Sequence, residues 1–109
     1  MSAIRNMILS QGKGGTALVI TYQSRSYASL ELGMSEMMEI YYRGDGPFLV
    51  TWYRNGVMVE SRSGVSTFTT SFTARAEYMT SVSYRVEVID LHGGRVSTNF
   101  IISNGDMDA

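Results

Sequence analysis

The sequence predicts an all-β fold, a sandwich or a barrel, for a single domain of 109 residues. Short runs rich in Val, Ile, Thr, Tyr and Phe alternate between apolar and polar residues, as half-buried strands do. Clusters of Gly, Asn and Ser separate these runs, as turns separate strands. Helical periodicity is scarce, and a hydrophobic fraction of 44% is enough for one packed core.

The alternation predicts nine strands, near 4–9, 17–22, 28–32, 36–42, 48–53, 57–60, 66–73, 82–90 and 95–103. Asn55-Gly56 is the sharpest turn signal, because both residues tolerate positive φ and suit a two-residue hairpin. The segment 73–81 does not alternate, so we expect a loop or a short helical turn there. Further turns are expected at 12–15, Gly33, 43–46, Ser63-Gly64 and 92–94.

The N-terminal strand stands apart from the rest. Residues 1–16 combine an apolar alternation with a glycine-rich hinge, which predicts an arm or an extra edge strand ahead of a sandwich at 17–103 and a flexible tail at 104–109. The arm can cover an edge of its own sheet or add to the sheet of a partner. Covering the edge of its own sheet is the more favourable role, because an unpaired edge strand promotes aggregation.

The middle strands provide the core. MMEIYY places Ile40 on one face with its alternate neighbours, and FLVTWY places Phe48, Val50 and Trp52 on one face. The large indole of Trp52 is therefore expected at the centre of the core. Near the end of the chain, SYRVEVID puts Val86 on one face with Tyr84.

Residues 17–103 resemble a cysteine-free immunoglobulin-like domain of the I-set or bacterial and phage type. The features that carry the resemblance run from the strand before the Gly46-Pro47 loop to the Gly-rich hairpin at 92–94. The resemblance implies an antiparallel Greek-key β-sandwich, with Ile40 and Val86 where antibody-type domains place their bridging cysteines. Trp52 would pack on both, and Tyr84 would occupy the position of the tyrosine corner. The sequence departs from the antibody pattern in lacking both cysteines and the Asp-x-Gly-x-Tyr run.

The candidate interface is the outward face of the sheet predicted from the strands near 48–53, 82–90 and 95–103. Its apolar members are Leu49, Tyr53, Ile89 and Ile101, which polar and charged residues accompany. Outer faces of antiparallel sheets are usually more polar, so aliphatic side chains and a tyrosine rimmed by charge suggest a docking surface. The alternative is that these are scattered surface apolar residues, or that the N-terminal strand covers them.

No motif predicts catalysis or a cofactor. The stretch 11–20 resembles a phosphate loop but lacks its Gly-Lys-Ser/Thr ending and the helix that should follow. Arg43-Gly44-Asp45 has the composition of an integrin ligand, although Gly and Asp are also common turn residues. His92 and Asp90 form the only His–carboxylate pair that could activate a nucleophile. A single histidine in a chain without cysteine predicts no zinc site.

The acidic residues do not form a catalytic pair or a cation site. Glu36 and Glu39 fall on opposite faces of their strand, so they cannot flank one substrate bond. Asp90, Asp106 and Asp108 show no regular calcium-ligand spacing. We therefore expect that the protein is not an enzyme and needs no cofactor or metal.

The composition argues against nucleic acid and membrane as partners. A net charge of −1 without a basic stripe argues against nucleic acid, and no apolar run is long enough to span a membrane. The N-terminus lacks a secretory apolar region and the chain has no cysteine, which favour synthesis in a reducing cytoplasm.

The chain also resembles, in architecture only, the virion-associated immunoglobulin-like proteins of tailed phages. That resemblance implies a decoration protein bound to a viral capsid or tail protein, with weak adhesion to host surface glycans. The alternative is an adhesin or carbohydrate-binding module from a larger protein of a bacterial cell surface.

Overall fold

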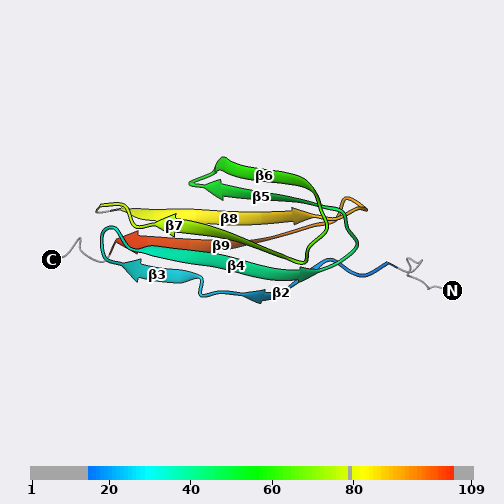
Figure 1. Ribbon diagram of the computed structural model, residues 1–109, viewed down its shortest axis with the longest axis horizontal. Helices are drawn as coiled ribbons and strands as arrows, with labels where there is room; N and C mark the ends of the chain where they lie inside the picture. Colours follow the sequence, from blue (N-terminus) through cyan, green and yellow to red (C-terminus); the bar gives the residue numbers. More distant parts are fainter. Residues whose placement is uncertain (1–14, 79, 105–109) are drawn as a thin grey trace.

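The computed structural model describes residues 15–78 and 80–104 as two facing β-sheets (Figure 1). A three-stranded sheet has the order β2-β4-β7, and a five-stranded sheet has the order β3-β9-β8-β5-β6. The strands are β2 (Val19–Gln23), β3 (Tyr27–Leu30), β4 (Ser35–Arg43), β5 (Phe48–Arg54), β6 (Val57–Val65), β7 (Thr69–Arg75), β8 (Ser81–Ile89) and β9 (Arg95–Asn104). The all-β prediction is confirmed, and the described part of the chain contains no helix.

Two of the expected boundaries are wrong. The Ser63-Gly64 turn lies inside β6, where Gly64 adopts φ +66° at a shift in register against β5. Glycine there accommodates a bulge, which lets the strand continue to Val65. The loop expected from Thr73 begins later, because β7 stays paired with β4 as far as Ser35↔Arg75.

The ends of the chain are described only in part. Residues 1–14 of the expected arm, including the strand expected at 4–9, and residues 105–109 of the expected tail lie outside the described residues. Asn104 belongs to β9, where it is buried and its side-chain amide donates a hydrogen bond to the Leu30 carbonyl at 3.0 Å.

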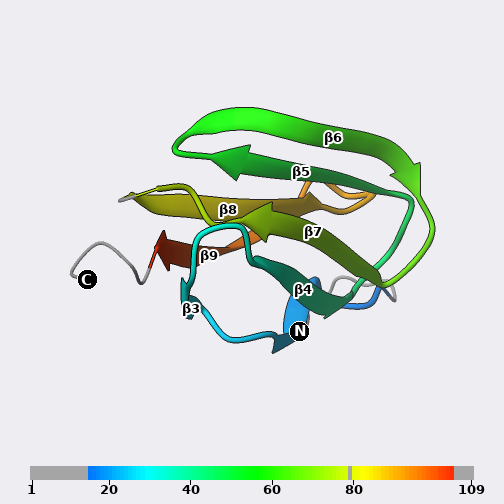
Figure 2. The same ribbon diagram turned by 60° about the vertical axis from the view of Figure 1, so that its left-hand side comes forward.

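One stretch of chain contributes to both sheets. β2 runs antiparallel to β4, whereas β3, a few residues later, runs parallel to β9. At the crossing, the Gln23 side chain accepts a hydrogen bond from Thr98 Oγ1 at 2.7 Å and donates one to the Asn99 carbonyl at 3.1 Å. This crossing links the two sheets along one side of the sandwich (Figure 2).

Trp52 lies at the centre of the core. It is fully buried, and its ring stacks on Phe72 of the opposite sheet and on Phe100 of its own sheet, with centroid distances of 5.6 and 6.0 Å. Its indole Nε1 donates a hydrogen bond to Thr70 Oγ1 at 3.1 Å. Val86 is its register partner on β8, so the side chains of β5 and β8 present one continuous apolar surface to β4 and β7.

The other expected core residues are also buried. Ile40 and Val86 have no exposed surface, and Tyr84 is 4% exposed. Tyr84 pairs in register with Arg54, whose guanidinium binds the Glu77 carboxylate. Hydrogen bonding to Glu77, and to a smaller extent to Tyr84, raises the pKa of Arg54.

A second aromatic group fills the end of the core near the β4–β5 connection. The rings of Tyr42 and Phe48 meet edge to face at 5.0 Å, and Phe68 covers Phe48 at 5.8 Å. The Tyr42 hydroxyl donates a hydrogen bond to the Thr67 carbonyl at 2.9 Å, and burial raises the pKa of Tyr42. The β6–β7 connection is thereby fixed to β4.

We expect Trp52→Ala to lower the free energy of unfolding by about 3–5 kcal/mol, because it leaves a cavity between Phe72 and Phe100. Trp52→Phe keeps a stacking ring but loses the bond to Thr70, so its loss should be smaller. Urea unfolding measures both, with Met37→Ala, 52% exposed, as the control. A control as damaging as Trp52→Ala would contradict the central role of the indole.

Candidate binding surfaces

Asp45 joins three segments at one end of the sandwich. Its carboxylate accepts a hydrogen bond from the Thr16 amide at 3.0 Å and lies 3.0 Å from His92 Nε2. Its carbonyl accepts a hydrogen bond from the Leu91 amide at 2.9 Å. The hydrogen bond with His92 and then that with Thr16 lower the pKa of Asp45. The acidic residue of the Arg-Gly-Asp sequence thus connects the N-terminal segment to the β8–β9 hairpin.

The expected pairing of His92 with Asp90 takes a different form. Asp90 Oδ1 accepts hydrogen bonds from the backbone amides of His92 at 3.0 Å and Gly94 at 2.8 Å, so it closes the hairpin turn. The His92 ring contacts Asp45 of another loop instead. Sequence spacing could not reveal this contact, because 47 residues separate the two.

The acidic residues lie apart from one another. Glu36 forms two hydrogen bonds with Arg25, at 2.8 and 2.9 Å, which lower the pKa of Glu36, whereas Glu39 lies on the other face of β4. Within 15–78 and 80–104, no three His, Asp or Glu side chains gather closely enough to hold a metal ion. Asp106 and Asp108 lie outside the described residues. No helix in the described part is long and apolar enough to cross a membrane.

The four candidate interface residues lie on strands of the five-stranded sheet, at two separate places. Leu49, 37% exposed, pairs with Ile89 at one end. Tyr53 lies four residues further along β5, about 13 Å away at strand spacing. Ile101, 38% exposed, lies between Ser83 of β8 and Tyr27 of β3.

Polar residues occupy the space between these two places. Thr51 is 6% exposed and shares a hydrogen bond of 3.1 Å with Ser61 of β6. Beside Thr51, Glu87 accepts a hydrogen bond from Arg95 at 3.2 Å. The sheet therefore has a small aliphatic end and a larger mixed region beyond it.

The mixed region is centred on Tyr53. The Arg85 guanidinium lies 4.3 Å from the centroid of the Tyr53 ring, which is cation–π geometry. Met58 is opposite Tyr53 in register and 59% exposed, and Tyr27 is 58% exposed beside Ile101. Met58 and Tyr27 were absent from the sequence prediction, because only the pairing of β6 with β5 and of β3 with β9 brings them here.

The three-stranded sheet carries an exposed tyrosine pair. The rings of Tyr22 and Tyr41 lie 5.1 Å apart at 55°, and their exposed fractions are 49% and 47%. Strict alternation would place Tyr22 on the same face as Ile20, but β2 shifts register between them and Tyr22 becomes the partner of Tyr41. This bulge has no signal in the sequence, so the pairing of the two rings could not be predicted from alternation.

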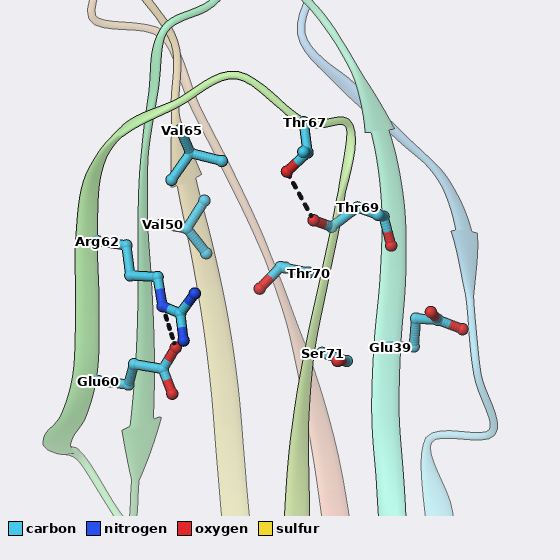
Figure 3. Close-up of a pocket in the computed structure, with 9 residues that line it drawn as sticks. All are labelled: Glu39, Val50, Glu60, Arg62, Val65, Thr67, Thr69, Thr70 and Ser71. Carbon is cyan, nitrogen blue, oxygen red and sulfur yellow. Dashed lines mark hydrogen bonds and ion pairs between the residues drawn. The ribbon is translucent and has the colours of Figure 1, made fainter.

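A polar groove of about 290 Å³ lies between β6 and β7 (Figure 3). An ion pair of 2.8 Å between Arg62 and Glu60 forms one wall. Hydroxyl groups form the other wall, where Thr67 Oγ1 donates a hydrogen bond of 3.3 Å to the Thr69 carbonyl. The remaining lining residues are Glu39, Val50, Val65, Thr70 and Ser71.

A scan against protein-family models, a search of curated proteins and a search of solved structures each found no match to this chain. The functional inference therefore depends on the surfaces described above.

Because the pKa of Asp45 is lowered in the folded chain, its contacts stabilise the fold fully at pH values above the ordinary aspartate pKa of about 3.9. This stabilisation is lost as the pH falls through the lowered folded value. We expect Asp45→Asn to flatten the dependence of the urea midpoint on pH between about 5 and 2. Glu31→Gln, at an exposed position, is the control. Equal acid sensitivity in the native protein and Asp45→Asn would contradict this assignment.

Proposed function

We propose that this chain is a non-catalytic binding protein with an immunoglobulin-like fold, which docks a protein partner on the outer face of its five-stranded sheet. The observation that carries the proposal is the stacking of Arg85 on Tyr53, with the exposed Met58 opposite Tyr53 in register. Tyr, Met and Arg are enriched at protein interfaces, and Tyr and Arg dominate their binding energy. Ile101 and Tyr27 extend this region toward the edge of the sheet.

The strand arrangement supports the immunoglobulin-like part of the proposal. β5, β8 and β9 lie in one sheet with β6, and β2, β4 and β7 lie in the other. Trp52 on β5 is buried with Ile40 on β4 and Val86 on β8, the three positions that the resemblance assigns to the core. The crossing of the N-terminal stretch from one sheet to the other is consistent with an I-set domain.

The partner we propose is a capsid or tail protein of a virus particle, to which the chain binds as decoration after synthesis in the host cytoplasm. The architectural resemblance to virion-associated immunoglobulin-like proteins supports this setting. The engagement of His92 and Asp90 in loop contacts supports a role without catalysis.

If this face docks the partner, Tyr53→Ala/Ile101→Ser should reduce co-sedimentation with purified particles of the encoding virus by at least tenfold. Both side chains lie on the sheet surface and not in the central core, so thermal unfolding should shift by only a few degrees. Leu49→Ser/Ile89→Ser tests the aliphatic end separately. The matched control is Val19→Ser/Met37→Ser, at exposed positions of the other sheet. Undiminished binding by both interface variants would exclude the face.

A second candidate function is carbohydrate binding by an adhesin or a surface module. The observation that favours it is the exposed pair Tyr22–Tyr41, since aromatic rings offer apolar faces on which sugar rings stack and hydroxyls that bind their polar groups. Thr69 lies directly across from Tyr41 on β7 and adds a polar group beside the pair.

In that case, Tyr22→Ala/Tyr41→Ala should abolish retention of the protein on immobilised host-cell polysaccharide. Tyr27→Ala/Tyr78→Ala removes two rings elsewhere that are more exposed than the pair and should leave retention unchanged. Equal loss from both double variants would indicate non-specific adsorption and would reject this function.

A further inference from the structure

Arg85 lies in a row of side chains that crosses the outer face of the five-stranded sheet. Its register partners are Tyr53 on β5 and Asn99 on β9. Met58 of β6 is opposite Tyr53, so the row extends over four strands, about 14 Å at ordinary strand spacing. Tyr53 is half-buried, whereas Arg85, Asn99 and Met58 are exposed. A partner that docks on this face therefore meets the Arg85 side chain directly.

The positive charge of Arg85 is not neutralised on this face. Within residues 15–78 and 80–104, Arg85 forms no ion pair. Glu87, two residues further along β8, has a side chain that is only 15% exposed and is bound by Arg95 at 3.2 Å. On the outer side of β5, β8 and β9, alternation places these two arginines and one glutamate. Because Glu87 and Arg95 neutralise each other, the charge of Arg85 remains.

The contact with Tyr53 prepares the Arg85 guanidinium for a carboxylate. The guanidinium carbon lies 4.3 Å from the centroid of the Tyr53 ring, so the ring covers one face of the cation. The N–H donors of a guanidinium lie in its plane, and a ring on one face leaves them available. A guanidinium is weakly hydrated, and its donors match the two oxygens of a carboxylate.

We infer that the partner presents the carboxylate of an Asp or Glu side chain to Arg85, with apolar side chains on either side of it. This inference rests on the function proposed above, and it names the chemistry of the partner at that face. The carboxylate accepts hydrogen bonds from the Arg85 guanidinium and the side-chain amide of Asn99, which neighbours it on β9. The apolar side chains contact Met58 and Tyr53 to one side and Ile101, the next outward residue of β9, to the other.

The single uncompensated cation favours an acidic protein surface over a nucleic acid. One guanidinium balances one carboxylate, whereas a nucleic-acid backbone is bound by several cations along its phosphates. Around Arg85, the row and its neighbours supply rings, a thioether and neutral polar groups, as interface centres do. A partner with a lysine or an arginine at this point would place like charges together, so Arg85 selects against it.

A peptide titration followed by nuclear magnetic resonance tests the chemistry without the partner. The 15N-labelled native chain is titrated with acetyl-Leu-Glu-Leu-amide, and acetyl-Leu-Gln-Leu-amide is the matched control. The Arg85 Nε–H signal should shift saturably at millimolar glutamate peptide and should not do so with the glutamine peptide. Arg85→Gln should remove the response of the Asn99 amide to the glutamate peptide. Equal responses to the two peptides, or no response at Arg85, would overturn the inference.

Co-sedimentation with purified particles of the encoding virus separates this inference from the proposed function. Arg85→Glu should reduce binding by about tenfold or more, because it places like charges together, and Arg85→Lys should reduce it less. Arg75→Glu makes the same change of charge at an exposed position of the other sheet and should bind like the native chain. Thermal unfolding of each variant checks that the fold is intact.

The two possible failures give different results. If Tyr53→Ala/Ile101→Ser lowers binding to the particles and Arg85→Glu does not, the docking face stands and the acidic partner is wrong. If neither variant lowers binding, the proposed docking face fails, and the inference about Arg85 fails with it.

Discussion

The stacking of Trp52 between Phe72 and Phe100 is the contact on which the remaining structure depends. It places one rigid ring across the interior, where it touches both sheets and donates a hydrogen bond to Thr70 of the opposite one. A small domain buries little surface, so one indole in this position supplies a large part of the packing. In a chain without disulfides, side-chain contacts of this kind hold the sheets in register.

Both outer faces follow from that core. Because alternate residues of a strand point to opposite sides, fixing Trp52 inward on β5 sends Tyr53 outward, and fixing Ile40 inward on β4 sends Tyr41 outward. The two surfaces proposed for binding are thus set by the same alternation that builds the core. A slip of one residue in either strand would bury a tyrosine and expose a core side chain.

The sequence was sufficient for the strands whose alternation is strict. β4, β5 and β8 lie close to their predicted ranges, and the burial of Trp52 follows from its face. It was insufficient where the backbone departs from alternation, as at the bulge that turns Tyr22 outward or at Gly64, which continues a strand. The contact of His92 with Asp45 depends on loops meeting in space, and the row from Met58 to Asn99 becomes visible only once the register is known.

The parallel pairing of β3 with β9 has a mechanical consequence. The chain enters β3 from β2 and leaves β9 at Asn104, so tension between the two ends of the domain pulls these parallel strands in opposite directions along their length. The register pairs from Tyr27↔Ile101 to Leu30↔Asn104 are then loaded together in shear and do not open one after another. A domain held at both ends would resist stretching through this short ladder together with the pairing of β2 with β4, through which tension from the N-terminal side passes before it reaches β3.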